Sequence, residues 1–177
     1  MGIGDDTAAR RLRLLATEFT TPARRGSAEV AAARPAHSSA PLNLGIIDHM
    51  RAAVAEVVGQ VRETAPDAGP RPEDDTAVYA WWRDGTAHLD DDAQQAREAI
   101  IYRQSLEHAI AMGDHDVIRP NLCPGCGCVG LMWDRLRRHV ACVNRYCVDD
   151  VGLARTWTLA QVAHHHVGQK MLKKSAT

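Results

Sequence analysis

Apolar residues recur at helical spacing through the middle of the chain. In the first stretch they are three or four residues apart: Ile47, Met50, Val54, Val57 and Val61. This spacing puts the side chains on one face of an amphipathic helix, and Ile46 and Val58 widen that face. Asn43 suits the N-cap, and Pro66 cannot continue a helix. We therefore predict a helix from about Asn43 to just before Pro66.

A second, short helix is predicted after a turn rich in proline and glycine. Pro72 and the acidic residues 73–75 suit its start, because a helix N-terminus favours negative charge, and Gly85 ends it. Trp81 and Trp82 lie within it. We expect these two side chains to fill a core, although a ligand or nucleobase platform is the alternative.

The third predicted helix runs from Asp90 to Gly113. Its stripe consists of small and apolar residues at helical spacing: Ala96, Ala99, Ile100, Tyr102, Leu106, Ala109 and Ile110. Gly113 stands where a left-handed C-cap is expected. The acidic residues 90–92 are interpreted as a solvated helix N-terminus and not as a cation site. Short connections then predict a small antiparallel helical unit.

Residues 1–41 lack a sustained pattern. Arg10 to Phe19 could form a short helix with Leu12, Leu15 and Phe19 on one face. The remainder is rich in Pro, Ser, Gly and Arg, which is typical of a linker. We expect a flexible basic arm that contains one short helix.

Four cysteines form two close pairs near the C-terminus. Two residues separate Cys123 from Cys126, four separate Cys142 from Cys147, and fifteen separate the pairs. This pattern is typical of a tetrahedral zinc site. Four thiolates leave no open coordination position, so we predict one structural Zn²⁺ per chain and no metal-based chemistry.

Other interpretations of these cysteines stay open. A disulfide framework would scatter its cysteines, whereas all five lie between residues 123 and 147, which favours a metal in a reducing cytosol. Cys128 could bring a third thiolate near Cys126, as in an iron–sulfur cluster, but we prefer a small buried residue on the first strand. His139 could replace a thiolate, but we expect it on a strand surface. The histidines at 164–166 are interpreted as incidental surface residues.

Short strands are expected between the two cysteine pairs and after the second pair. Residues 129–140 are long enough for two antiparallel strands with a turn near Asp134, and a third strand is expected around 153–157. Thr158 and Gln161 fit a capping box that starts a C-terminal helix. The expected fold class is α+β and mostly α. Its expected parts are a flexible basic arm (1–41), an acidic helical unit (42–116), a zinc ribbon (117–157) and a C-terminal helix (158–177).

Charge is distributed unevenly along the chain. The net charge of −1 hides +2 over residues 1–40, −9 over 41–116 and +6 over 117–177. Either the acidic and basic parts have different partners, or they complement each other within one fold. We find no apolar run of about 18 residues and therefore expect no membrane span. Arginines at 10, 11 and 13 argue against a signal peptide.

The cysteine region resembles a known family. Cys-Pro-Gly-Cys-Gly at 123–127, the knuckle Cys142 to Cys147 and the strand leading to Trp157 resemble the zinc-ribbon group. Residues 141–159 also look like small zinc-ribbon proteins of actinobacteria and their phages. The resemblance covers about residues 119–158. It implies a place in nucleic-acid machinery or a protein-docking role, and it carries over no catalytic residues.

We expect no enzymatic activity. The chain has no phosphate-binding glycine loop, no His-Glu-x-x-His and no nucleophile elbow. The zinc-deaminase pattern requires a His-x-Glu ahead of a Pro-Cys-x-x-Cys, and it fails here because no His-x-Glu precedes the Cys-Pro-Gly-Cys sequence at 123–126. Binding of a macromolecule is therefore the expected class of function.

Two partners are considered for that binding. A nucleic acid would be held by arginines and aromatic side chains of the ribbon: Arg135, Arg137, Arg138, Arg145, Trp133 and Tyr146. Alternatively, Trp133 packs under the ribbon and the arginines are merely solvated. In the second hypothesis the protein is a structural or assembly protein of the phage-virion type. Its zinc ribbon is then a rigid docking module, and basic and acidic segments could pair between copies as a homo-oligomer. The expected location is the cytoplasm of a bacterial host, or a virion.

Overall fold

The structure is a computed structural model that describes residues 6–19 and 44–175. Its helices are α1 (Thr7–Leu14), α2 (Leu44–Thr64), α3 (Val78–Gly85), α4 (Asp91–Ala111) and α5 (Leu159–Ser175). A π-helical turn (Leu15–Phe19) extends α1, and 3₁₀ turns lie at Asp75–Ala77 and Asp116–Ile118. The strands are β1 (Leu131–Asp134), β2 (His139–Cys142) and β3 (Thr156–Trp157). The predicted class, α+β and mostly α, is confirmed.

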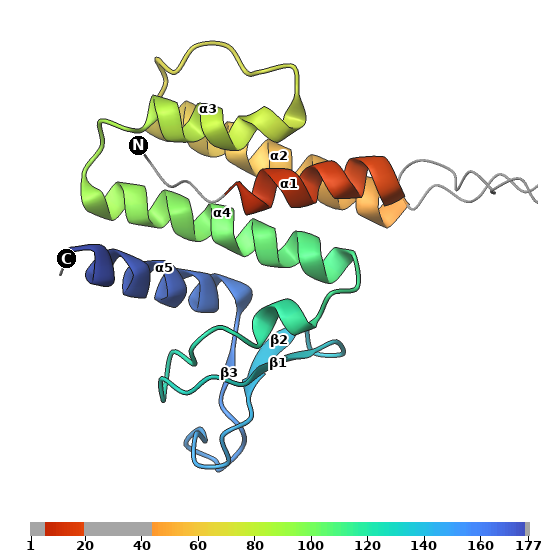
Figure 1. The fold of residues 1–177 in the computed structure, drawn as a ribbon, viewed down its shortest axis with the longest axis vertical. Helices are drawn as coiled ribbons and strands as arrows, with labels where there is room; N and C mark the ends of the chain where they lie inside the picture. The colour runs from red at the N-terminus through yellow and green to blue at the C-terminus, as the bar shows by residue number, and fades with distance from the viewer. Residues whose placement is uncertain (1–5, 20–43, 176–177) are drawn as a thin grey trace, which may run out of the picture.

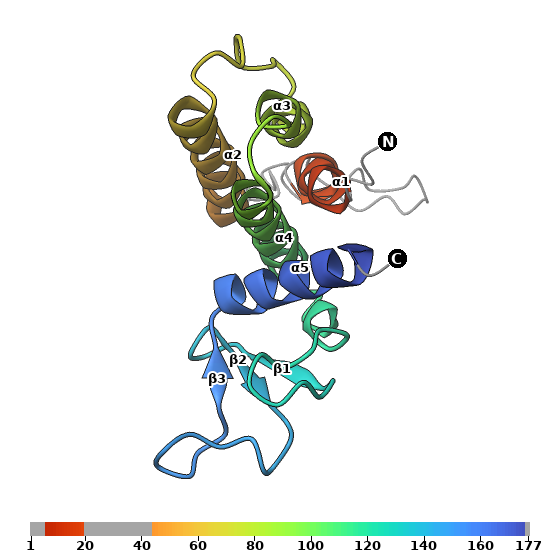
Figure 2. The same ribbon diagram turned by 90° about the vertical axis from the view of Figure 1, so that its left-hand side faces the viewer.

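Helix α4 lies in the middle of the molecule. Figure 1 shows α1, α2 and α3 on one side of it and α5 on the other, with the three-stranded ribbon beyond α5. Figure 2 shows the same order after a quarter turn. Helix α4 packs against both α1 and α5. It therefore belongs to the helical unit and also forms the support on which the ribbon region rests.

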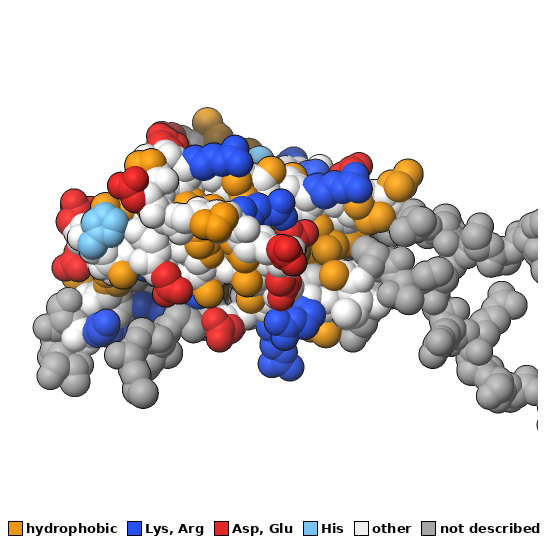
Figure 3. Space-filling model, turned by 90° about the horizontal axis from the view of Figure 1, so that it is seen from above, with side chains coloured by type: hydrophobic (Ala, Val, Ile, Leu, Met, Phe, Trp, Pro, Cys, Tyr) orange, Lys and Arg blue, Asp and Glu red, His pale blue; other side chains and the backbone are white. Residues whose placement is uncertain are grey.

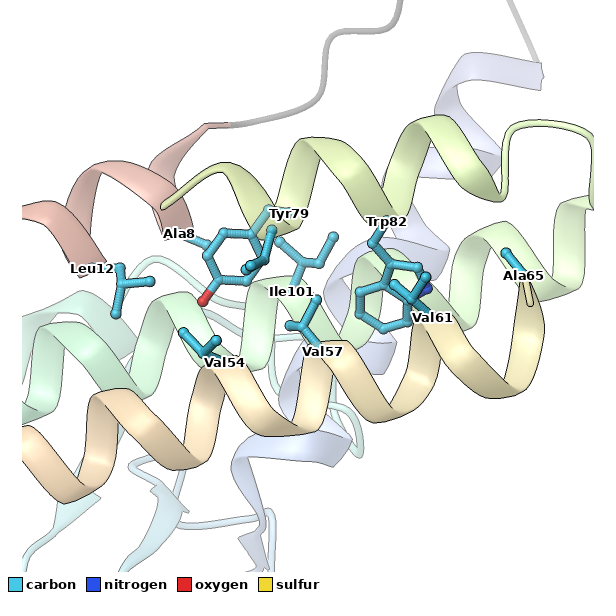
Figure 4. Close-up of a cluster of buried hydrophobic side chains, with 10 residues drawn as sticks. Ala8, Leu12, Val54, Val57, Val61, Ala65, Tyr79, Trp82 and Ile101 are labelled. Atoms are coloured by element: carbon cyan, nitrogen blue, oxygen red, sulfur yellow. The ribbon is translucent and has the colours of Figure 1, made fainter. Parts of the chain in front are cut away.

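The helices on the upper side of α4 enclose an apolar core, which we call the helical core. Figure 4 shows side chains of α1, α2, α3 and α4 meeting there. Its buried members are Ala8, Leu12, Val54, Val57, Val61, Ala65, Val78, Tyr79, Trp82 and Ile101. Trp82 is buried, as predicted, whereas Trp81 is half-buried and donates its indole N–H to the carbonyl of Ala68 at 2.9 Å. The face of α2 predicted from sequence spacing therefore points into a real core.

The short helix expected near the N-terminus is present as α1. Leu12 and Leu15 are both buried, and Arg11 reaches α4, where it donates to the carbonyl of Ser105 at 2.9 Å and to its hydroxyl at 2.7 Å. These contacts tie α1 to the centre of the fold. Residues 20–41 of the predicted arm, like the predicted cap Asn43, lie outside the described residues.

The predicted ends of α4 are confirmed. Asp90 accepts a hydrogen bond from the N–H of Ala93 at 2.8 Å, and Gly113 adopts the left-handed φ of 89°. The middle of α4 differs from the predicted stripe, because polar Gln104, Ser105 and His108 are buried there. Tertiary packing on two sides buries α4 more widely than an apolar stripe implies.

The ribbon is an antiparallel sheet in the order β1-β2-β3. Leu131 pairs with Cys142 and Asp134 with His139, so the turn at 135–138 closes the far end of the hairpin. A second apolar cluster, which we call the ribbon core, joins the sheet to α4 and α5. Its buried members are Leu106, Ile118, Cys123, Leu131, Val140, Cys142, Cys147 and Val162.

Helix α5 begins with the predicted capping box. Gln161 donates its backbone N–H to the Thr158 hydroxyl at 3.2 Å, and its side-chain carbonyl accepts from the N–H of Thr158 at 2.9 Å. Val162 is fully buried in the ribbon core. His166 stacks on Tyr102 of α4, with ring centroids 4.1 Å apart. The C-terminal helix is thus packed against α4.

Acidic and basic side chains are interspersed on the end of the molecule opposite the ribbon. Figure 3 shows red and blue groups separated by apolar side chains on that face. The acidic count of the helical segment therefore does not produce a single acidic surface there. No helix in the described ranges combines the length and the apolarity needed to cross a bilayer.

Candidate metal centre and neighbouring surfaces

The four paired cysteines converge on one point. The sulfur atoms of Cys123, Cys126, Cys142 and Cys147 all lie within 4.8 Å of one another. Two of these separations run between the knuckles, at 3.8 Å for Cys123–Cys147 and 3.7 Å for Cys126–Cys142. Four sulfurs bound at about 2.3 Å to a tetrahedral zinc ion lie about 3.8 Å apart. The arrangement therefore fits a metal ion of that size.

Local backbone structure builds the first knuckle. The N–H of Gly127 donates to the carbonyl of Cys123 at 2.9 Å, and the N–H of Cys123 donates to the carbonyl of Cys128 at 2.9 Å. Gly127 has a left-handed φ of 70°, which glycine adopts without strain. Gly125 is required for a different reason, since a Cβ there would lie 2.9 Å from the indole of Trp157.

The second knuckle is held by the last strand. The N–H of Cys142 donates to the carbonyl of Arg155 at 3.1 Å, and the N–H of Arg155 donates to the carbonyl of Cys147 at 2.9 Å. Asn144 turns the intervening loop, because its backbone and side-chain oxygens accept from the N–H groups of Cys147 and Tyr146. Strand β3 and the residues before it thus fix both cysteines of this pair.

Without a cation, the pKa values of two of these thiols, Cys126 and Cys147, are shifted in opposite directions. The backbone N–H of Cys128 lowers the pKa of Cys126 to about 6, because it donates to the thiolate. Burial raises the pKa of Cys147 to about 12, and the neighbouring thiols add to this effect. A metal cation would remove the repulsion between four thiolates. The donor set is therefore one that a soft divalent ion satisfies.

The structure leaves Cys128 and His139 outside the cluster. Cys128 is exposed and precedes β1, so the interpretation of this residue as a buried strand residue is wrong. The short Cys126–Gly127–Cys128 turn places its thiol beside Asn144, whose amide donates to the sulfur at 3.7 Å. His139 is exposed at the start of β2, and its Nδ1–H donates to the carbonyl of Arg137 at 2.6 Å. Four cysteines form the candidate site.

The residues predicted to bind nucleic acid lie in two groups. Arg135, Arg137 and Arg138 are exposed in the β1–β2 turn, while Arg145 and Tyr146 are exposed in the second knuckle. The four-residue strands place these groups about 10 Å apart, at opposite ends of the hairpin. In the knuckle, Arg145 covers the ring of Tyr146 with its guanidinium 4.8 Å from the ring centroid.

Trp133 does not join either group as an open stacking surface. It is half-buried and packs against the ribbon core. It also lines a cavity of about 640 Å³ between the ribbon and the helices. The other lining residues come from α2, α4, the hairpin turn and the start of α5: Gly45, Ile46, His49, Arg103, Glu107, Ile110, Ala111, Arg138, Thr158, Leu159 and Ala160.

A buried polar network next to this cavity was missed in the sequence. Tyr79 donates to the side-chain carbonyl of Gln104 at 2.8 Å and lies 2.9 Å from Nε2 of His108. Nδ1 of His108 lies 2.8 Å from Nε2 of His49. Burial lowers the pKa of His108 to about 3, with the charges of His49 and nearby arginines acting in the same direction. The available signal was Gln104 and His108 at i, i+4 spacing on an otherwise apolar helix face.

Comparisons of the chain with protein-family models, curated proteins and solved structures gave no match. What the protein does is therefore inferred from its own residues.

Proposed function

We propose that this chain is a non-enzymatic zinc-ribbon protein that binds a nucleic acid through the basic side of its ribbon. The zinc ion holds the two knuckles and the three strands together and does no chemistry, because four cysteines fill its coordination sphere. The similarity of the cysteine pattern to small zinc-ribbon proteins of actinobacteria and their phages is compatible with this role.

The observation that carries the proposal is the Arg145–Tyr146 pair. Tyr146 is 77% exposed, and Arg145 lies over its ring while donating to its hydroxyl at 2.6 Å. A preorganised guanidinium and an exposed aromatic ring match a phosphate and an unstacked base, respectively. The turn arginines at the other end of the hairpin then supply further phosphate contacts.

Fluorescence anisotropy with single-stranded DNA and RNA oligonucleotides tests this proposal. We expect binding that weakens steeply with salt, and a loss of about 1–3 kcal/mol on Tyr146→Ala. The matched control is Val151→Ala, since Val151 is a similarly exposed apolar residue in the loop after the knuckle. Absence of binding at low salt, or equal affinity of Tyr146→Ala and the parent, would reject the proposal.

A second candidate function, protein docking in an assembly, is favoured by a different observation. Among the described residues, the large exposed apolar side chains are concentrated on the ribbon: Val129, Met132, Leu136, Val143, Tyr146, Val148, Val151 and Leu153. Leu136 at the hairpin tip is 96% exposed. Concentrated exposed apolar surface is typical of protein interfaces. In this alternative the ribbon is a rigid docking module, as in a phage structural protein.

Sedimentation velocity of the zinc-loaded chain over a range of concentrations separates the two candidates. Self-assembly that is lost in Leu136→Ser, without any nucleic-acid binding, would favour the docking function. A monomer at every concentration, together with salt-sensitive oligonucleotide binding, would favour the nucleic-acid function.

A further inference from the structure

The cavity between the ribbon and the helices has the size of a small-molecule site. Its volume is about 640 Å³, and ligand pockets are typically about 300–1,000 Å³. Residues of α2, α4, the β1–β2 turn and the start of α5 form its walls. Much of this lining is apolar: Ile46, Ile110, Ala111, Trp133, Leu159 and Ala160. A ligand in this cavity therefore buries an apolar body, and the few polar groups of the wall decide what else it must carry.

One end of the hydrogen-bond network beside the cavity has a fixed direction. The side-chain N–H groups of Gln104 donate to the carbonyl of Ala53 at 3.1 Å and to the carboxylate of Glu56 at 2.8 Å. Both of these partners only accept hydrogen bonds, so the amide oxygen of Gln104 is the atom that faces Tyr79. The Tyr79 hydroxyl therefore donates to this oxygen, at 2.8 Å, and has no second proton to donate.

The direction of the tyrosine hydroxyl sets the protons of the two histidines that follow. Nε2 of His108 lies 2.9 Å from the Tyr79 oxygen, so this nitrogen carries a proton and donates it. Burial lowers the pKa of His108 to about 3, so its ring is neutral at pH 7 and its Nδ1 has a lone pair. Nδ1 of His108 lies 2.8 Å from Nε2 of His49, which is therefore the protonated nitrogen of His49.

Nδ1 of His49 is an unused hydrogen-bond acceptor. Burial lowers the pKa of His49, and the charges of Arg138 and Arg103 act in the same direction, so the ring is neutral at pH 7. Its Nε2 is directed at His108, which does not line the cavity, whereas His49 itself does. Its Nδ1 forms no hydrogen bond within the described part of the chain. A ligand in the cavity satisfies this nitrogen only by donating an N–H or O–H to it.

Charges around the cavity favour neither an anion nor a cation. Arg103 and Arg138 line it, and Arg103 pairs with Glu107 of the lining and with Glu56 outside it. Two guanidinium groups are therefore matched by two carboxylates. An anionic group beside His49 would face the lone pair of Nδ1, and a cationic group there would face the two arginines that already lower the pKa of His49. An uncharged donor avoids both kinds of repulsion.

We propose that this cavity binds an uncharged aromatic molecule that donates one hydrogen bond to Nδ1 of His49. The body of the molecule packs against Trp133, Ile110 and Leu159. An aromatic body suits the indole of Trp133, because aromatic pairs add to the stabilisation from apolar burial. The buried network makes the site selective, since it prevents His49 from offering an N–H to the ligand. This proposal goes beyond the nucleic-acid function and does not depend on it.

NMR titration of the zinc-loaded full chain with indole and benzofuran tests the proposal. These two probes have nearly the same shape, but only indole carries an N–H donor. We expect saturable shifts of the Trp133 resonances with both probes, a larger shift of the His49 Nδ1 resonance with indole, and roughly three- to tenfold tighter binding of indole. Without a ligand, the nitrogen resonances of His49 should show Nε2 protonated and Nδ1 unprotonated at pH 7.

A second set of probes tests the preference for an uncharged ligand. Benzyl alcohol carries an O–H donor, and benzoate and benzylammonium are its charged counterparts. Both ions should bind about tenfold more weakly than benzyl alcohol, because each loses its water without gaining a partner of opposite charge.

His49→Phe is the decisive variant. Phenylalanine retains an aromatic ring at this position but has no acceptor, so indole should lose its advantage over benzofuran. Because the two probes are compared within each protein, any loss of stability from the broken contact with His108 affects both alike. The matched control is His88→Phe, since His88 is exposed and does not line the cavity. This control should keep the preference for indole.

Several results would overturn the proposal. They are the absence of saturable shifts with both indole and benzofuran, equal affinity of the parent for these two probes, a retained preference for indole in His49→Phe, and a His49 ring protonated at Nδ1 at pH 7. Tighter binding of either ion than of benzyl alcohol would also contradict it. None of these results bears on oligonucleotide binding through Arg145 and Tyr146, so the two proposals fail independently.

Discussion

At the scale of single residues, the neighbouring thiols of Cys126 and Cys128 have different surroundings. Both are exposed, but the sulfur of Cys126 lies 3.7 Å from that of Cys142, whereas the sulfur of Cys128 accepts from the amide of Asn144 and is outside the cysteine cluster. The spacing of cysteines predicted the four converging residues correctly. It could not place Cys128, because the direction of its side chain depends on the turn made by Gly127.

Serine substitutions at these two positions should have different effects on zinc binding. Cys128→Ser should retain zinc, whereas Cys126→Ser removes one of the four proposed ligands. We expect this loss to weaken zinc binding by roughly 100-fold or more, because losing a residue that only hydrogen-bonds to a ligand already costs about 10–100-fold. Competition with a chromophoric chelator, together with metal analysis, measures both variants. Equal loss of zinc in the two variants would show that Cys128 also serves as a ligand.

Alanine substitution at two glycines, Gly125 and Gly59, should change the unfolding free energy in opposite directions. In Gly125→Ala the new Cβ would lie 2.9 Å from Cζ2 of Trp157, so unfolding free energy should fall by about 1–3 kcal/mol. Gly59 of α2 has nothing within 4 Å of such a Cβ, and Gly59→Ala should stabilise by about 0.5–1 kcal/mol. Urea unfolding of the zinc-loaded proteins measures both values. An unchanged unfolding free energy in Gly125→Ala would show that the knuckle and the indole of Trp157 can move apart without loss of stability.

At the scale of elements, apolar spacing and capping residues carried most of the predictive information. The bounds of α2, α4 and α5 follow from features that act locally: a repeating apolar face, an aspartate N-cap and a capping box. Burial of His108 and Gln104 was not predictable in this way. These residues are buried because other helices and Tyr79 surround α4, and a single helix pattern does not contain that information.

The buried imidazole of α4 should make stability depend on pH. His108 has a pKa of about 3 in the folded chain, against an ordinary value of 6.5. The unfolded chain therefore binds more protons between these values. Stability is fully present above about pH 6.5, and it falls with pH by up to about 1.4 kcal/mol per unit for this residue.

Urea unfolding between pH 4 and 7 measures this slope. His108→Gln should lower stability at pH 7, because its hydrogen bonds to His49 and Tyr79 are disturbed, but it should flatten the pH dependence. His164→Gln, which changes an exposed histidine of α5, is the control and should leave the slope unchanged. Proton competition at the cysteines is common to all three proteins and cancels in the comparison. An unchanged slope in His108→Gln would contradict the assignment.

At the scale of the whole molecule, two apolar cores share α4. The helical core includes Ile101 from this helix, and the ribbon core includes Leu106, one and a half turns further on. The charge pattern of the sequence indicated separate acidic and basic segments, but not that one helix would join them. Contacts between distant segments decide this arrangement. Three cysteines of the candidate site are part of the ribbon core, so metal binding should act on one core more than on the other.

Removal of zinc should therefore unfold the molecule in part. Metal binding contributes on the order of 10 kcal/mol to small zinc domains, and without it Cys123, Cys142 and Cys147 no longer hold the strands together. The helical core contains no cysteine and has its own buried Tyr79 and Trp82. Hydrogen exchange with and without chelator should show lost protection in residues 117–175 and retained protection in α2 and α3.

The same experiment distinguishes partial from cooperative unfolding. Added zinc should restore protection of the ribbon, whereas magnesium, which prefers oxygen ligands, should not. Loss of protection in α2 at the same rate as in β1 and β2 would mean that the two cores unfold as one unit through α4. Full protection of the ribbon in the presence of chelator would mean that its apolar cluster suffices without metal. Among the buried members of the ribbon core, α5 contributes one aliphatic residue, Val162, and β2 contributes one, Val140. We therefore expect the ribbon to require the metal in order to stay folded.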